Sequence, residues 1–317
     1  MLLIAIVIIA ALLTLAITLF ESRVHYSVLE DTQSQLKVST QQMRDHINNT
    51  IADSQADLRF LHATPPISGL PRAYFNKGVD PFDGTQYKQW KQQLETIFIA
   101  FMQNKAHIEQ LRVVSTLADD PGAELIRVER RGGLIEALPD YSLQNKRDTD
   151  YYAASAELIA NRVFMSRLNL NRENGEVEFP YRPMLRYAIA VFAPDGQRFG
   201  FLIMNVNANQ LLTDLAALSP QYGELVISSS EGDIIYHPDE AYRFTRDLDP
   251  KISWNSLYGA HINSDVLSQV KSKLTSDTWY VLSGKANTRN SEQYNYVNLS
   301  IFVPAAYISA SINDKRL

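Results

Sequence analysis

Residues 184–207 read MLRYAIAVFAPDGQRFGFLIMNVN and hold two apolar runs separated by a turn. The runs MLRYAIAVF (184–192) and RFGFLIMNV (198–206) have the length and the side-chain pattern of strands. The proline and glycine of APDGQ between them are typical of a tight connection. This stretch therefore predicts two antiparallel strands of one sheet.

Further strands and one helical segment surround this pair. LRVVST and AELIRVER, joined by DDPG, predict a hairpin from Leu111 to Arg130, and RVFMSRLNL (162–170) predicts another strand. The segment YYAASAELIA, which begins at Tyr151, has helical character. Together they predict an α+β module, an antiparallel sheet with helices to one side, that closes near Leu215.

A smaller module of the same kind follows. Its expected strands are GELVISSS, DIIYHPD, TWYVLSG (278–284) and YNYVNLSIFVP (294–304), with a variable stretch that runs to about Thr275. Within that stretch, Ser268 to Lys271 is expected to be helical and polar. The final AAYISASINDKRL starts as a helix, so residues 304–317 are expected to lead back toward a membrane.

The N-terminal segment predicts that membrane. Residues 1–20, MLLIAIVIIAALLTLAITLF, carry no charge, and at ~1.5 Å per residue a helix of this length covers the ~30 Å hydrocarbon core of a bilayer. A cleaved signal peptide is the rival interpretation, but the segment has no basic start and no A-x-A site before Glu21. We therefore predict a transmembrane helix, whose orientation charge bias does not fix because no Lys or Arg precedes it.

Residues 21–63 predict a long stalk helix, since they contain no proline or glycine. Its apolar side chains form one stripe, which either docks onto the chain's own domain or pairs two copies in a homodimer. The prolines and glycines of residues 65–84 predict a loop of about twenty residues, after which YKQWKQQLETIFIAFMQNKAHI resumes a helix. The stripe comprises Val24, Val28, Met43, Ile47, Ile51, Leu58 and Leu61.

Composition excludes several classes of function. With 30 Lys and Arg against 35 Asp and Glu, the net charge is −5, and no basic surface for nucleic acid is expected. The chain has no cysteine, which excludes disulfides, thiolate metal sites and cysteine nucleophiles. A chain without thiols also suits an oxidising space such as the periplasm.

The order of these elements resembles a known family. A membrane helix, a rod-like helix, LRVVS, GAELIRVER, LQNKRDTDYY, the segment from VFMSRLNL to FLIMNVN, and EGDIIYHPD are similar to the double Cache (dCache) sensors of bacterial receptors. These two-lobed, PAS-like extracytoplasmic domains precede histidine kinases, diguanylate cyclases and chemoreceptors. The resemblance implies a membrane-distal lobe over residues 64–215, a membrane-proximal lobe over 216–303, and placement in the periplasm at the bacterial inner membrane.

The resemblance also implies a function. The distal lobe would bind a small molecule, and a shift of the long helix would carry the signal to a cytoplasmic output module, a kinase or cyclase for example, so the sensing region itself is not expected to be an enzyme. Because no output module is seen before Leu317, we expect a sensor fragment or a truncated gene product. No cofactor or metal is expected.

The amino-acid-binding branch of this family sets a residue pattern for the distal lobe. There, an arginine two positions before an aromatic residue holds the ligand carboxylate, and an aspartate on the last strand holds its amine. If Tyr151 is that aromatic residue, Thr149 replaces the arginine and Asn205 replaces the aspartate. The resemblance therefore implies a small polar or anionic organic ligand in place of an α-amino acid.

Other side chains of the distal module remain candidates. Arg147 would hold a carboxylate or phosphate as a fork, Lys146 as a point charge, whereas an exposed loop with local ion pairs is the plain alternative. Arg186 and Tyr187 are consecutive strand residues, so at most one of them faces the ligand, and Arg186 has Glu173 or Glu178 as structural alternatives. The candidate ligand-binding residues are Lys146, Arg147, Tyr151, Tyr152, Arg186, Tyr187 and Asn205.

Two other classes of protein stay open. One is an anchored hydrolase with paired carboxylates such as Glu173 and Glu176, although the chain has no G-x-S-x-G, H-E-x-x-H, Walker or G-x-G-x-x-G motif. The other is an ectodomain that binds a partner protein and no small molecule. His237 and Asp239 in YHPD have the types of metal ligands, but a turn at Pro238 is the preferred interpretation.

Overall fold

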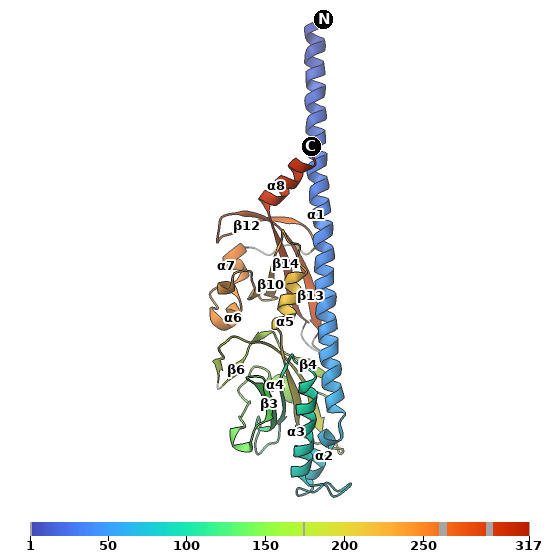
Figure 1. Ribbon diagram of the computed structural model, residues 1–317, viewed down its shortest axis with the longest axis vertical. Coiled ribbons are helices and arrows are strands. Elements are labelled where there is room, and N and C mark those ends of the chain that lie inside the picture. The colour runs from blue at the N-terminus through green and yellow to red at the C-terminus, as the bar shows by residue number, and fades with distance from the viewer. Residues whose placement is uncertain (1, 174, 260–264, 290–293, 317) are drawn as a thin grey trace. The chain divides into compact units, whose positions relative to one another are not determined.

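The computed structural model describes residues 2–173, 175–259, 265–289 and 294–316 (Figure 1). The chain divides into two compact units, each with its own antiparallel sheet. The seven-stranded unit comprises residues 47–213 and 287–295, and the five-stranded unit comprises residues 1–46, 214–286 and 296–317.

Helix α1 (Leu2–His62) is one uninterrupted helix, blue in Figure 1, that contains both the predicted membrane segment and the predicted stalk. Residues 4–23 are exposed along it, and by length and composition α1 can cross a membrane. Farther along, the predicted apolar stripe is buried within the chain, at Val28, Met43, Ile47, Ile51, Leu58 and Leu61. The stripe is thus used internally, and dimerisation stays a prediction.

The loop predicted over residues 65–84 is wrong in its first half, where the structure has helix α2 (Pro65–Phe75). Pro65 and Pro66 occupy its first two positions, where a backbone N–H has no helical partner to lose. Gly69 also lies within α2 and does not break it. Its lack of a side chain lets the Trp90 ring of α3 (Tyr87–Gln103) approach closely, since a Cβ at Gly69 would lie 2.4 Å from Cε2 of Trp90.

The seven-stranded sheet has the order β3-β2-β1-β9-β8-β4, with β5 also paired to β8. The predicted hairpins are present, while the strand predicted over 162–170 is split into β4 and β5. A separate two-stranded sheet, β6-β7, and two short helices, η1 (Asp140–Ser142) and α4 (Tyr152–Ala156), complete the unit. The strands are β1 (Ile108–Ser115), β2 (Glu124–Arg131), β3 (Leu134–Ala137), β4 (Val163–Met165), β5 (Asn169–Leu170), β6 (Arg172–Glu173), β7 (Glu176–Val177), β8 (Pro183–Phe192) and β9 (Arg198–Asn207).

The five-stranded sheet has the order β11-β10-β14-β13-β12. The helix predicted at Ser268 to Lys271 is wrong, since these residues form β12, which pairs with β13 and alternates partly buried with exposed side chains. The confirmed fold class is α+β. The elements after β9 are α5 (Asn209–Ala217), β10 (Glu224–Ser229), β11 (Ile234–Tyr236), η2 (Glu240–Tyr242), α6 (Thr245–Leu248), α7 (Trp254–Tyr258), β12 (Ser268–Lys271), β13 (Thr278–Arg289), β14 (Tyr294–Pro304) and α8 (Ala305–Asp314).

Candidate functional site

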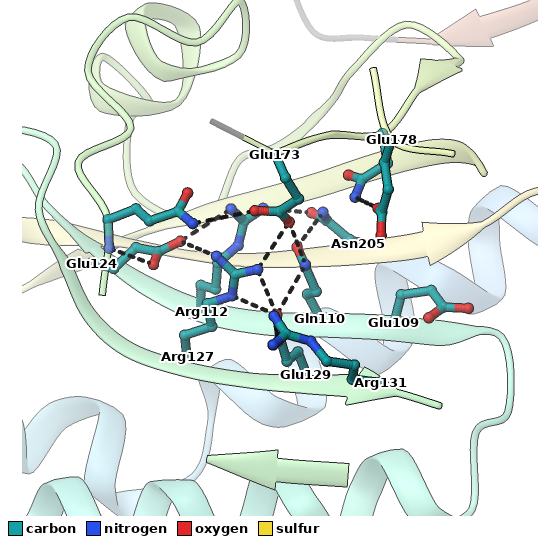
Figure 2. Close-up of polar contacts among 12 residues, drawn as sticks. Glu109, Gln110, Arg112, Glu124, Arg127, Glu129, Arg131, Glu173, Glu178 and Asn205 are labelled. Carbon is teal, nitrogen blue, oxygen red and sulfur yellow. Dashed lines mark hydrogen bonds and ion pairs between the residues drawn. The ribbon is translucent and has the colours of Figure 1, made fainter. Parts of the chain in front are cut away.

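A row of polar side chains crosses the middle of the seven-stranded sheet. Gln110 on β1 is in register with Glu129 on β2 and with Asn205 on β9, and Asn205 is in register with Arg186 on β8. All four residues are buried. Figure 2 shows labelled members of this row on the side of the sheet away from the helices below it. Buried polar groups need partners, so this face must be held by a hydrogen-bond network.

Arg112 lies at the centre of that network. It follows Gln110 by two residues on β1, so the two share a face, and it is 2% exposed. Its Nη1 donates to the Tyr151 hydroxyl at 3.1 Å and to Glu124 Oε1 at 3.3 Å, and its Nη2 donates to Asn205 Oδ1 at 2.8 Å. Its buried Nε has no hydrogen-bond partner among the described residues. Arg112 therefore has one buried hydrogen-bond donor, Nε, that no described residue engages.

The stretch LQNKRDTDYY (143–152) passes over this face and is anchored to the turn before β2. The backbone N–H of Lys146 donates to the carbonyl of Gly122 at 2.7 Å. The Lys146 ammonium group donates to Gln144 and lies 3.8 Å from Glu124 Oε1, and burial, together with the charge of Arg112, lowers the pKa of Lys146. Arg147, by contrast, is exposed. The loop thus turns one of its two cations inward and the other outward.

The two tyrosines after the loop differ in the same way. Tyr151 is 5% exposed, and its ring centre lies 5.7 Å from the guanidinium carbon of Arg112 and 5.4 Å from that of Arg186. These distances are within the range of cation–π contacts. Tyr152 is half-buried and packs against Phe201 in an apolar cluster beside the polar row. Tyr151 belongs to the polar site, and Tyr152 borders it.

Arg186 and Tyr187 lie on opposite faces of β8, as strand alternation predicts. Arg186 donates to Asn169 Oδ1 and Asn171 Oδ1, and Asn171 in turn donates to Glu178. Tyr187 is fully buried, burial raises its pKa to about 12, and Ser54 of α1 lies against its hydroxyl. The structure therefore brings Lys146, Tyr151, Arg186 and Asn205 together, and it does not bring Arg147 or Tyr187 to them.

Several polar residues of this face escaped sequence reasoning. Arg127 on β2 is 1% exposed, and its Nη2 donates to Glu129 Oε2 at 2.5 Å and to Glu173 Oε1 at 2.9 Å. The signal was present in the two strands of the first hairpin: each places polar residues two positions apart, which puts them on one face. The residues missed are Gln110, Arg112, Glu124, Arg127 and Glu129.

The environment of Glu173 bears on the hydrolase alternative. Burial raises the pKa of the Glu173 carboxyl, but Arg127, Lys146 and the amides of Gln110 and Gln144 outweigh it and bring the pKa to about 2. A general acid needs a pKa near the working pH, so this carboxylate is suited to ion pairing and not to proton donation.

Metal ligation is not indicated by the described part of the chain, where no group of three His, Cys, Asp or Glu side chains could hold an ion. His237 instead lies 2.8 Å from the Tyr258 hydroxyl through Nε2 and accepts from the Asp239 backbone at 3.0 Å through Nδ1. These contacts fit the predicted turn at Pro238.

Residues 76–257 match the family model described as the bacterial histidine kinase sensor domain. The chain belongs to this family. The match covers more than half of the chain and includes the whole polar face described above. No curated protein matches this chain.

Solved structures confirm the Cache-type sensor fold. A domain of a sensory box/GGDEF family protein from Vibrio parahaemolyticus has a TM-score of 0.63 at 16% identity, over 90% of this chain and 99% of that one. The Campylobacter jejuni chemoreceptor Tlp3, in complex with L-valine, has a TM-score of 0.58 at 14% identity, over 91% and 97%. The Pseudomonas fluorescens chemoreceptor CtaA, in complex with L-serine, has a TM-score of 0.54 at 15% identity, over 87% and 99%. At these identities the likeness concerns the fold.

Proposed function

We propose that this sensor domain is the ligand-sensing region of a bacterial membrane receptor, and that its seven-stranded unit binds a small organic ligand on the polar face around Arg112. The observation that carries the proposal is the buried Arg112 side chain, which donates to Tyr151 and Asn205 and whose Nε has no partner among the described residues. A buried, unsatisfied donor of a charged group is costly, and a ligand acceptor would satisfy it.

Asn205 supports a ligand other than an α-amino acid. Its Oδ1 accepts from Arg112 and its Nδ2 donates to Gln110 Oε1 at 2.9 Å. Both ends of this neutral amide are therefore engaged, and it offers no counter-ion to a ligand ammonium group. Lys146 and Arg112 bring positive charge to the same face, which favours a ligand that carries a carboxylate or another anionic group.

The proposal includes transmission through helices. Residues 1–20 of α1 would lie in the inner membrane with the rest of the chain in the periplasm, and residues 64–215 and 216–303 would act as distal and proximal lobes. Within the five-stranded unit, the two residues that follow α8 form ion pairs with α1, Lys315 with Asp31 at 2.6 Å and Arg316 with Glu21 at 3.5 Å. A ligand that binds one conformational state of a homodimer tenfold more tightly than the other would shift the equilibrium between the two states by about 1.4 kcal/mol.

A thermal-shift screen of the full chain in detergent tests this function. The library contains organic acids, amines, amino acids and nucleobases, and a positive compound should also protect the backbone amides of residues 143–152 from hydrogen exchange. If nothing in the library changes the melting temperature, and pull-down instead returns a periplasmic protein, the chain is a protein-binding ectodomain.

A further inference from the structure

The carboxylate of Glu173 is held by donors from three different elements. Its Oε1 accepts from Arg127 Nη2 on β2 at 2.9 Å and from Gln110 Nε2 on β1 at 3.2 Å. Its Oε2 accepts from Gln144 Nε2, in the loop over the sheet, at 3.3 Å. Figure 2 shows Glu173 reaching down to these donors from above the sheet. Three converging donors, one of them a buried guanidinium, are what a protein uses to bind a carboxylate.

Glu173 differs from Glu124 and Glu129, the two carboxylates of β2, in its access to solvent. Its side chain is 25% exposed, whereas those of Glu124 and Glu129 are 0% and 3% exposed. It also comes from the two-residue strand β6 of the separate β6-β7 sheet, while the other two belong to β2 of the main sheet. Of the three, Glu173 is therefore the carboxylate that can leave its donors without disturbing the main sheet.

Arg127 would keep partners if Glu173 left. Its Nη2 also donates to Glu129, and its Nη1, which has no hydrogen-bond partner among the described residues, lies 3.6 Å from Glu124 Oε1. The donors of Gln110 and Gln144 and one donor of Arg127 would then face an open position, where the charges of Arg127 and Lys146, which lower the pKa of Glu173, favour an anion. An incoming carboxylate would restore both the hydrogen bonds and the charge balance.

We propose that Arg127, Gln110 and Gln144 form a carboxylate seat, that Glu173 fills this seat in the ligand-free chain, and that the carboxylate of the ligand replaces it. The inference rests on the small-molecule function proposed above and makes its ligand a carboxylate. Glu173 is then a built-in competitor: each binding event must displace it, so it lowers the apparent affinity of the site and sets the concentration at which the sensor responds.

The test uses Glu173→Ala, with Glu176→Ala as the matched control. Glu176 is the register partner of Glu173 on β7 and is exposed, so its replacement changes the same charge without opening the seat. The full chain in detergent is titrated with sodium acetate at constant ionic strength, and with acetamide as the neutral probe of the same shape. Glu173→Ala should bind acetate at least tenfold more tightly than the wild type, and neither variant should respond to acetamide.

Equal acetate binding by wild type and Glu173→Ala, or an equal gain in Glu176→Ala, would overturn the seat. If Glu173→Ala does not fold, Glu173→Gln keeps the shape of the side chain without its charge, and it should bind acetate more tightly than the wild type; no gain would again overturn the seat. The two proposals fail separately. A compound from the screen that binds wild type and Glu173→Ala equally would contradict the carboxylate seat but not the sensor function. A screen that finds no ligand would contradict the sensor function even if acetate binds to Glu173→Ala.

Discussion

Arg112 on β1 donates from Nη1 to the hydroxyl of Tyr151 at 3.1 Å, which joins a central strand of the sheet to the loop that passes over it. Both side chains are buried. This contact couples the position of the loop to the polar face, together with those of Gln144 and Lys146 to Glu124, so a ligand that engages Arg112 also acts on residues 143–152.

Replacing Tyr151 with Phe tests this contact. The substitution keeps the ring between Arg112 and Arg186 but removes the acceptor, so a buried guanidinium loses a hydrogen bond, which costs about 1–3 kcal/mol of unfolding free energy. Denaturant unfolding measures this loss. Tyr141→Phe is the control, because Tyr141 is 91% exposed, and an equal effect in both variants would contradict a special role for Tyr151.

Replacing the two adjacent cations of the loop, Lys146 and Arg147, should have different effects on the unfolding free energy in the same assay. Lys146 is buried beside Glu124, so Lys146→Met should lower the unfolding free energy by roughly 1–3 kcal/mol and weaken binding of any ligand found in the screen. Arg147 is exposed, so Arg147→Met should stay within about 0.5 kcal/mol of wild type. If Arg147→Met were the variant that lost ligand binding, the outward placement of Arg147 would be wrong.

Residues 143–152 illustrate which features of the candidate site can be predicted from the sequence and which cannot. The strand pattern placed the loop between strands of the first module, and strand alternation correctly separated Arg186 from Tyr187. Periodicity could not choose between Lys146 and Arg147, because that choice depends on the contact between Lys146 and Gly122, two segments distant in sequence. Arg112 was not predicted as a site residue because an arginine in a strand usually points to solvent. In the structure, Tyr151 and the loop cover it, and it is buried.

Gly122 should be essential for that loop contact. A Cβ there would lie 2.6 Å from the backbone nitrogen of Arg147, at a φ of +89°. Gly196 has a similar φ of +85° but nothing within 4 Å of its Cβ position, so Gly196→Ala carries the left-handed strain alone, about 1–2 kcal/mol. Calorimetric melting should show a larger loss for Gly122→Ala than for Gly196→Ala. Equal losses would mean that the loop is not anchored at Gly122.

Acid should weaken the seven-stranded unit through Glu173. Its pKa is lowered from 4.5 to about 2 in the folded chain. A lowered folded pKa contributes stability above the unfolded value, and this contribution is lost as the pH falls from about 4.5 toward 2. The melting temperature of wild type should therefore fall more steeply over this window than that of Glu173→Gln, while Glu176→Gln should follow wild type. If the melting temperature of Glu173→Gln fell with pH as steeply as that of wild type, the Glu173 carboxylate would not be held by Arg127.

The most direct test of the sensor function is the affinity of the screened ligand for wild type and for Arg112→Gln, measured by titration calorimetry on the full chain. A ligand present at a hundred times its dissociation constant stabilises the folded state by about 2.7 kcal/mol, so binding and melting can be checked against each other. The expected result is a carboxylate that binds wild type and loses at least tenfold in affinity in Arg112→Gln, with the variant still folded. A ligand that binds both proteins equally would contradict a site built on Arg112.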